Sequence, residues 1–409
     1  MDGFTSLDFS TATLDTLIRL GKSAAEASLM RHSCFGANTV PSARALPKRI
    51  IGVSIGTRSS SERLALMRLL GLGLSDTLEP ALLRSRVRYL AYSEPYRAVW
   101  LSPRGAADSI AFDVSLQHAP RRVAGLGLAY DNELGGRMWA GVVDRRLVGL
   151  ALEGSSALFL GELRNELYLG FRRYFQVARQ LMTPTLTVRL ASESVRRFDS
   201  AGRELDALDT REILGFLGVE RYVGRDWQVA IGVVAHDWDE GTRDLSTVGG
   251  SLQLFRWARG SGRVFQGSFV GTGAYRRATL EGVAVGKIGR MRLQPRIRAG
   301  WGERLPIQLE LPLGGDNGFP GLHIGERRGD RELDVGLLLT CPLVGPVVAR
   351  IDLAAGRSAR SGPLLDTDGW LGGGRIGLGS ETPLGPVRFE YGRNTSGRGS
   401  VFVRLGRWF

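Results

Sequence analysis

Cysteine and histidine are scarce in this sequence. Its 409 residues include two cysteines, Cys34 and Cys341, and four histidines. The cysteines lie far apart and outside any CxxC pattern, which argues against a disulfide framework or a zinc site. No histidine has metal-ligand spacing, so each is expected on the surface or in a loop, and neither a metal nor a cofactor is predicted. The histidines are His32, His118, His236 and His323.

Long apolar runs are absent as well. No stretch of about 18 apolar residues exists, so no transmembrane helix is expected. A membrane-spanning β-strand needs only about 9–11 residues with apolar side chains at alternate positions, so the sequence still allows a membrane β-barrel. The start, MDGFTSLDFS, has neither the basic nor the apolar segment of a signal peptide. A membrane β-barrel of the bacterial outer membrane must be exported. If the chain forms such a barrel, we expect the sequence to be a fragment or its natural start to lie upstream.

Positive charge is in excess, but it is dispersed. The formal net charge of +13 would suit a nucleic-acid-binding protein. The arginines, however, form no basic cluster with interleaved aromatics, so nucleic acid is not an expected partner. The 56 glycines concentrate after residue 120. Glycine-rich sequence suits curved sheets, and dispersed arginines suit a polar barrel lumen or contact with anionic lipid head groups.

The pattern divides the chain into three parts. Residues 1–47 show a helical period over Ala12–Met30 and then a proline-containing loop. Residues 48–120 predict a small α+β unit, whereas residues 121–409 contain short alternating runs separated by turn residues. The elements expected in the α+β unit are Arg49–Gly56 (strand), Ser61–Leu70 and Thr77–Tyr89 (helices), and Ala98–Leu101 and Ser109–Leu116 (strands).

Alternation in the third part predicts a membrane barrel. In Trp227–Ala235 every second residue is apolar, and in Val347–Leu353 apolar side chains oppose Arg350 and Asp352. A soluble β-sandwich would also alternate, but paired opposite charges indicate a wet lumen and aromatics near strand ends indicate interfacial girdles. About sixteen strands fit the span, so we expect a mainly β protein with a transmembrane antiparallel β-barrel. The girdle candidates are Trp139, Tyr174, Phe175, Trp227, Trp257, Trp301 and Trp408.

The end of the chain is an amphipathic strand. Val401, Val403, Leu405 and Phe409 share one face, because successive side chains point to opposite sides. This pattern resembles the terminal strand of bacterial outer-membrane β-barrels, where the final Phe is part of the signal read during barrel insertion. The resemblance implies an outer-membrane location, with outer-membrane lipids and the barrel assembly machinery as partners.

A glycine-rich segment resembles a lumen loop of the outer-membrane assembly and two-partner-secretion superfamily, also called the bacterial surface antigen family. Leu313–Leu322, followed by Gly329–Glu332, is similar to the long sixth loop, which folds into the lumen and carries an aliphatic-Arg-Gly-aromatic tetrad. The tetrad position here reads Phe319-Pro320-Gly321-Leu322, so the Arg that usually anchors the loop is missing. The loop residues implied are Gly314, Gly315, Phe319, Gly321 and Leu322.

Further segments carry the same resemblance. Arg350–Gly356 is similar to the wall strand whose acid meets that loop, so Arg350 and Asp352 are expected on the wall, with Asp352 lacking its usual partner. Gly372–Gly379, Glu381–Phe389 and the last strand are similar to the last three strands of the family.

The region before the barrel resembles a polypeptide-transport-associated (POTRA) domain. The β-α-α-β-β order of residues 48–120 and the run Tyr92–Tyr96 carry this likeness. It implies a periplasmic module that can pair with a polypeptide client at a sheet edge.

A narrower likeness concerns patatin-like phospholipases. Gly125–Asp131 with Gly135–Gly141 resembles the first hairpin of the barrels attached to these enzymes, and Met1–Ala27 resembles the end of a patatin domain. The implied parent is a self-exporting serine lipase whose catalytic domain is missing here.

The sequence contains one possible catalytic motif. Gly52–Gly56 reads GxSxG, the nucleophile motif of serine hydrolases, with Ser54 at its centre. Glycine is so common here that a chance match is expected in roughly one of two such chains. No Asp-Gly-Gly or Asp-Gly-Ala follows at useful range, and nothing in the sequence positions Asp113 or His118 as partners. We therefore expect no catalytic residue, and the chain is not predicted to be an enzyme.

These observations favour an outer-membrane translocator or surface-antigen-type barrel. The chain would be the membrane-anchoring and export part of a patatin-like phospholipase without its catalytic domain. Two alternatives stay open. One is a lipid esterase whose catalytic domain lies upstream, and the other is an assembly or insertase factor for other barrels, which the missing loop Arg and single POTRA unit disfavour.

Overall fold

The computed structural model describes most of the chain after residue 48. The described ranges are 22–23, 49–57, 63–64, 66–67, 70–73, 77–92, 96–106, 109–147, 152–173, 175–177, 180–223, 227–240, 244–258, 263–363, 365–366, 368–382 and 385–406. Lys22 and Ser23 are helical, and the rest of the helix expected over Ala12–Met30 lies outside the described residues. Among these ranges no helix is long and apolar enough to span a membrane.

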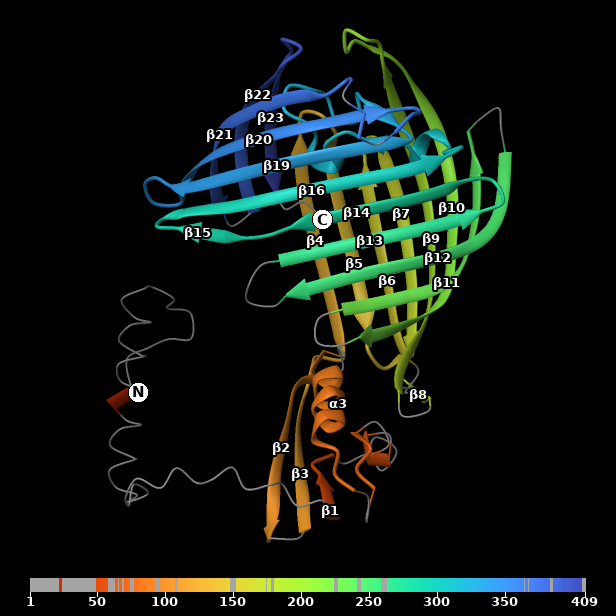
Figure 1. Ribbon diagram of the computed structural model, residues 1–409, viewed down its shortest axis with the longest axis vertical. Helices are drawn as coiled ribbons and strands as arrows, with labels where there is room; N and C mark the ends of the chain where they lie inside the picture. Colours follow the sequence, from red (N-terminus) through yellow and green to blue (C-terminus); the bar gives the residue numbers. More distant parts are fainter. Residues whose placement is uncertain are drawn as a thin grey trace. The chain divides into compact units, whose positions relative to one another are not determined.

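A three-stranded sheet precedes the barrel in the chain (Figure 1). Its strand order is β1-β3-β2, where β1 is Arg49–Ile55, β2 is Tyr96–Ala106 and β3 is Ser109–His118. β1 and β3 are parallel, whereas β2 and β3 are antiparallel. The second strand is longer than the expected Ala98–Leu101, and β2 lies at a sheet edge.

Helical residues provide the rest of the core of this unit. α3 (Pro80–Tyr92) contributes Leu90 to a buried cluster that includes Ile50 and Phe112. The helix expected at Thr77–Tyr89 begins three residues later, because Thr77 instead forms an isolated β-bridge with Arg49. Proline suits the first helical position, where its missing N–H has no intrahelical partner. The described residues of the other expected helix, at positions 63, 64, 66, 67 and 70, are helical.

Except for β17 (Leu311–Pro312) and β18 (Arg328–Gly329), the remaining strands form a closed antiparallel barrel of sixteen spanning strands, which confirms the predicted barrel (Figure 1). Two three-residue segments, β8 (Phe175–Val177) and β15 (Gly286–Ile288), only extend it alongside β9 and β16. The spanning strands are β4 (Arg122–Asp131), β5 (Gly135–Asp144), β6 (Leu152–Gly161), β7 (Arg164–Arg173), β9 (Gln180–Phe198), β10 (Glu204–Val223), β11 (Trp227–Asp239), β12 (Asp244–Ala258), β13 (Arg263–Thr272), β14 (Arg276–Val283), β16 (Met291–Glu303), β19 (Arg331–Pro342), β20 (Val347–Ala359), β21 (Leu371–Thr382), β22 (Gly385–Asn394) and β23 (Gly399–Gly406).

The two ends of the barrel are distinguished by the strand connections that they carry. Because consecutive strands run in opposite directions, the β4–β5, β16–β19 and β22–β23 connections share one end, which we call the loop end. The start of β4 and the end of β23 share the other end, which we call the terminal end.

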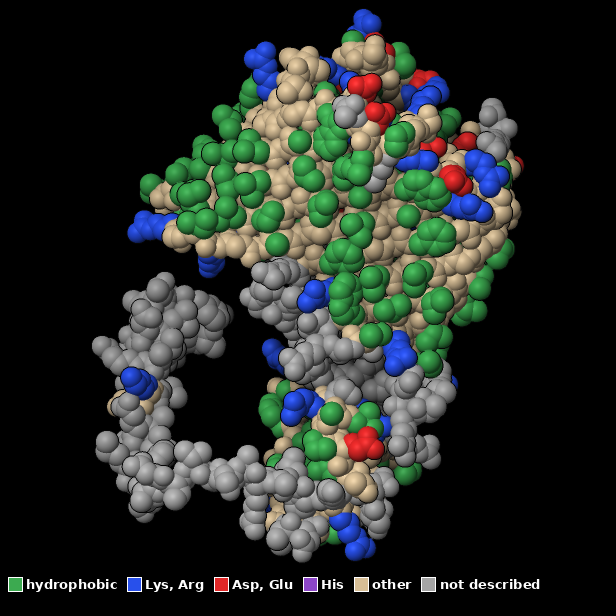
Figure 2. Space-filling model, viewed as in Figure 1, with side chains coloured by type: hydrophobic (Ala, Val, Ile, Leu, Met, Phe, Trp, Pro, Cys, Tyr) green, Lys and Arg blue, Asp and Glu red, His purple; other side chains and the backbone are tan. Residues whose placement is uncertain are grey.

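Side chains alternate between the outer face and the lumen as the sequence predicted. On β11, Ile231 and Val233 are 65% and 53% exposed, whereas Val234 is buried. Hydrophobic side chains spread over the barrel wall, and charged ones gather toward the loop end (Figure 2). This apolar outer belt is the surface that a bilayer would cover.

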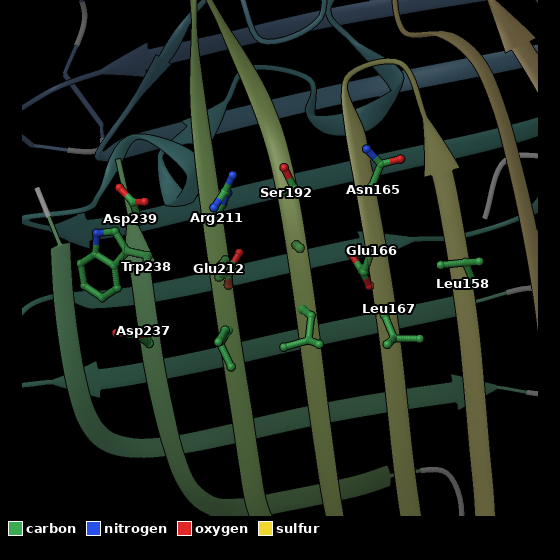
Figure 3. Close-up of a pocket in the computed structure, with 13 residues that line it drawn as sticks. Leu158, Asn165, Glu166, Leu167, Ser192, Arg211, Glu212, Asp237, Trp238 and Asp239 are labelled. Atoms are coloured by element: carbon green, nitrogen blue, oxygen red, sulfur yellow. The ribbon is translucent and has the colours of Figure 1, made fainter. Parts of the chain in front are cut away.

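The belt ends sharply near the loop end, beside a shallow depression of about 540 Å³ (Figure 3). Asn165, Ser192 and Arg211 are cross-strand neighbours in one row, and Arg211 lies opposite Asp239. The adjacent outward row is apolar and consists of Leu158, Leu167, Leu190 and Ile213. Such a change from apolar to polar rows is typical of a membrane interface.

The lumen face carries ion pairs, as the paired charges of the sequence suggested. Arg189 Nη2 lies 2.5 Å from Glu212 Oε1, between β9 and β10. His236 also faces this side, and its Nε2 lies 3.1 Å from the same oxygen while its Nδ1 lies 3.0 Å from the Tyr275 hydroxyl. His236 is 1% exposed, so the expectation of a surface or loop position was wrong for this histidine.

Trp139 also faces the lumen and is not part of an outer girdle. A Cβ on Gly127 would lie 2.1 Å from the indole Nε1 of Trp139, and one on Gly125 would lie 2.8 Å from the ring. The ring therefore lies against two glycines of β4, where no larger residue fits. This packing is a physical reason for the Gly125–Gly127 spacing in the first hairpin.

Candidate functional site: the loop between β16 and β19

The connection between β16 and β19 contains its own structure. It includes two 3-10 turns, η2 (Ile307–Leu309) and η3 (Gly315–Asn317), and a short hairpin of β17 (Leu311–Pro312) and β18 (Arg328–Gly329). Its central residues are buried against the inner wall of the barrel. We call residues 304–330 the plug loop.

Apolar side chains form the first attachment of the plug loop. Leu313, Phe319 and Leu322 are buried in one cluster with Ala354 of β20 and Leu371 of β21. Phe319 is fully buried, at 0% exposure. Burying one such side chain contributes about 2 kcal/mol, so this cluster favours the inserted position of the loop.

Glycines permit the second attachment, in which backbone meets backbone. A Cβ on Gly373 of β21 would lie 3.0 Å from Pro320 Cβ, and one on Gly392 of β22 would lie 2.9 Å from Gly321 N. Gly321 has φ +75°, and a Cβ there would lie 2.6 Å from the carbonyl oxygen of Arg398. Glycine is therefore required on both sides of this contact.

Guanidinium groups of the wall form the third attachment. Arg375 Nη2 donates to the carbonyl oxygen of Gly318 at 3.0 Å, and Arg404 Nη2 donates to that of Asn317 at 2.9 Å. Both guanidinium groups also lie over the ring of Phe402, at 4.3 and 5.1 Å from its centroid. The missing tetrad Arg therefore does not leave the loop unanchored, because the arginines come from the wall and the acceptors from the loop.

Arg350 and Asp352 of β20 lie on the wall, but they bind side chains of other strands and not the plug loop. Arg350 Nε donates to Glu390 Oε1 at 2.8 Å. Asp352 Oδ1 accepts from Arg296 Nη1 at 2.7 Å. Asp352 therefore pairs with Arg296 of β16, and this arginine supplies the charge that the missing loop Arg does not.

The loop end holds a fourth attachment, which we call the latch. His323 Nδ1 lies 2.9 Å from Glu133 Oε1 in the β4–β5 turn, and its ring stacks on Phe198 with centroids 5.5 Å apart. Glu326 also pairs with Arg398 of the β22–β23 turn. The plug loop is thus tied to two turns of the rim.

The interaction between His323 and Glu133 shifts the pKa of both side chains. The hydrogen bond to Glu133 raises the pKa of His323, although burial acts in the opposite direction. Burial alone would raise the pKa of Glu133, but the hydrogen bond and charge of His323, with the charge of Arg196, together lower it. The charged pair is therefore favoured across the neutral and mildly acidic range.

The seam between β23 and β4 closes the barrel. Within the described residues, which end at Gly406, these strands share three residue pairs, whereas β22 and β23 share seven and β4 and β5 share ten. Val401, Val403 and Leu405 point to the outer face, as expected, and Phe409 lies outside the described residues. Gly406, the last described residue, has φ +88° and pairs with Ala129.

Ser54 lacks the setting of a nucleophile. It lies within β1, directly opposite Asp113, and Asp113 pairs with Arg104 at 2.6 Å. A nucleophile elbow places its serine on a strained turn, but Arg304 is the one non-glycine residue with positive φ in the described ranges. Among the described residues there is also no group of His, Cys, Asp and Glu side chains that could hold a metal.

Comparison with known proteins identifies the fold. No protein-family model and no curated protein matches the sequence. The crystal structure of BamA from Haemophilus ducreyi lacking POTRA domains 1–3 aligns with a TM-score of 0.65 and 11% identity, over 88% of this chain and 84% of that chain. CdiB from Acinetobacter baumannii aligns with a TM-score of 0.60 and 14% identity, over 88% of this chain and 74% of that one. The chain shares their barrel fold.

Proposed function

We propose that this chain is an outer-membrane barrel for polypeptide transport whose lumen is closed by the plug loop. The observation that carries the proposal is the attachment of this loop to the inner wall by apolar, glycine and guanidinium contacts. The fold likeness to BamA and CdiB supports it. The apolar belt of the outer face supports a location in the outer membrane.

Residues 48–120 are proposed to be a POTRA-type module in the periplasm. The order β1-β3-β2 leaves β2 at an edge, and an edge strand can accept an extended client segment by backbone pairing. The module would then present a polypeptide client to the barrel.

A second function, assembly of other barrels, is favoured by the seam between β23 and β4. In the described part of the chain these strands share three residue pairs, the fewest of any two neighbouring spanning strands, and we propose that the sheet opens here. A client strand entering there would exchange with β23.

Site-specific photocrosslinking in cells tests both functions. A photoreactive residue at position 294, in place of Gln294, detects polypeptides in the lumen, and one in place of Tyr130 detects them at the seam. The control replaces Ile297, which lies on β16 like Gln294 but points to the outer face. Transport predicts polypeptide adducts from Gln294, and assembly predicts them from Tyr130. Adducts at neither position, or equal adducts from Ile297, would contradict both.

The link to a patatin-like phospholipase rests on the likeness of the first hairpin and of Met1–Ala27. An antibody to the barrel tests it by the size of the native polypeptide in isolated outer membranes. A band well above 44.5 kDa supports a catalytic domain before residue 1, and a band at 44.5 kDa contradicts it.

A further inference from the structure

A cavity of about 560 Å³ lies between the plug loop and the wall at the loop end, and we call it the chamber. Charged side chains line much of it. The arginines are Arg137, Arg164, Arg196 and Arg328, and the glutamates are Glu166 and Glu193. A volume of this size is typical of a small-molecule site.

The carboxylates of the lining are concentrated on one arginine. Arg164 Nη2 lies 2.5 Å from Glu166 Oε2, and its Nη1 lies 3.7 Å from Glu193 Oε2. Four guanidinium groups thus share a lining with two carboxylates, and both carboxylates face the same guanidinium. Of the other arginines, Arg137 pairs with Asp131 at 3.0 Å, and the carboxylates near Arg196 lie at 3.5 Å or more.

Arg196 has unused hydrogen-bonding capacity. Its Nη2 is buried and makes no hydrogen bond within the described part of the chain. The nearest carboxylate oxygens lie 3.5 Å from Nη2, on Glu133, and 3.8 Å from Nη1, on Glu204. Glu133 already bonds His323 through the latch. The guanidinium of Arg196 is thus held by long contacts only, and its side chain keeps 16% exposure, so an incoming oxyanion would find a charged donor group whose hydrogen bonds are not all used.

The chamber also has an apolar side. Phe159 and Leu163 line it together with Ile324 of the plug loop. A ligand with an apolar body would contact these side chains while its charged group reaches Arg196. Guanidinium groups bind carboxylates and phosphates through paired N–H donors, which fits either oxyanion.

We propose that the chamber binds a small organic anion, with its carboxylate or phosphate at Arg196 and its apolar part against Phe159. The inference concerns binding alone and stands whether or not the barrel transports polypeptides. Phenyl phosphate and benzoate are suitable probes, because each combines an oxyanion with a ring. Inorganic phosphate and benzyl alcohol each supply one half of that chemistry.

Binding is measured by isothermal titration on the purified, folded full chain. The proposal expects phenyl phosphate or benzoate to bind at least tenfold more tightly than inorganic phosphate or benzyl alcohol. Tighter binding of phenyl phosphate identifies a phosphate ligand as the source, and tighter binding of benzoate identifies a carboxylate. No binding of either probe, or equal binding of all four compounds, would overturn the proposal.

Arg196→Gln is the decisive variant and Arg197→Gln is its matched control. Arg197 is the next residue on β9, half-exposed and paired with Asp206, and it does not line the chamber. Arg196→Gln should weaken the better probe about tenfold or more, and Arg197→Gln should leave it unchanged. If Arg196→Gln does not fold, Arg328→Gln tests the chamber from the loop side and should also weaken the probe. Unchanged affinity in the folded chamber variant would overturn the proposal.

Discussion

The side-chain amide of Asn132 extends the seam by binding the backbone of Val403. Its Oδ1 accepts from Val403 N at 2.9 Å, and its Nδ2 donates to Val401 O at 2.8 Å. The backbone N–H of Asn132 also donates to Val403 O at 3.3 Å. A side chain thus takes the place of a peptide group where the ladder between β4 and β23 ends.

Removing this amide should weaken the seam. Asn132→Leu keeps the size of the side chain but loses two hydrogen bonds, at about 1 kcal/mol each, so the barrel should unfold at lower temperature. The measurement is the heat-induced mobility shift of the barrel in a detergent gel. Asn132→Asp keeps the acceptor for Val403 and should lose roughly half as much. An unchanged unfolding temperature in Asn132→Leu would show that the amide does not hold the seam.

The wall arginines should keep the plug loop inserted. Arg375→Gln combined with Arg404→Gln removes the guanidinium donors to Gly318 and Asn317, and frequent channel openings should appear in planar bilayers. Arg388→Gln is the matched control. Arg388 lies opposite Arg404 in the β22–β23 ladder and has no hydrogen bond or ion pair to the plug loop among the described residues. Equal opening in both variants would assign the effect to lumen charge and not to anchoring.

The latch should make opening depend on pH. Because the pKa of His323 is raised, its stabilising charge is fully present below its ordinary value and is lost as pH rises through the raised value. Because the pKa of Glu133 is lowered, its contribution is present above its ordinary value and is lost as pH falls through the lowered one. Channel openings should therefore increase above neutral pH and again in strong acid.

His323→Gln tests that pH dependence. It should raise openings at pH 6 toward the alkaline level and flatten the alkaline rise. His118→Gln, at the end of β3, should leave the wild-type profile unchanged. An alkaline rise that persists in His323→Gln would locate the titrating group elsewhere.

Alanine substitutions at two glycines distinguish the cost of backbone strain from the cost of a clash with the barrel wall. Gly321 and Gly397 both have positive φ, but a Cβ on Gly321 would meet backbone at 2.6 Å whereas nothing lies within 4 Å at Gly397. Gly397→Ala should cost about 1–2 kcal/mol of strain. Gly321→Ala should cost about 1–3 kcal/mol more, because the loop must move. Equal losses in chemical unfolding would mean that the loop does not press on the wall at Gly321.

Much of the barrel was predictable because a strand has a period of two. The same alternation that placed Ile231 and Val233 outside also places His236 inside, so strand parity alone could have found this buried histidine. Trp139 was wrongly predicted on the outer girdle for a related reason. Its place near a strand end was considered, but not which face of the strand its side chain occupies. The strand positions needed no knowledge of the tertiary structure.

The anchor of the plug loop could not be predicted from the loop itself. Its tetrad lacks an Arg, and the donors come from Arg375 and Arg404, which are far from the loop in sequence. A weak signal did exist. Arg375 interrupts the glycine-rich stretch Gly372–Gly379, and Arg404 interrupts an apolar terminal strand, so both needed a partner in the lumen.

Single-channel conductance of a loop-deleted barrel shows whether the plug loop closes the lumen. Residues 307–328 would be replaced by a short Gly-Ser linker, and insertion would be verified by the heat-induced mobility shift. We expect the full chain to be closed for most of the recording and the deleted barrel to give a large, steady conductance. A full chain that conducts as much as the deleted barrel would contradict the plug.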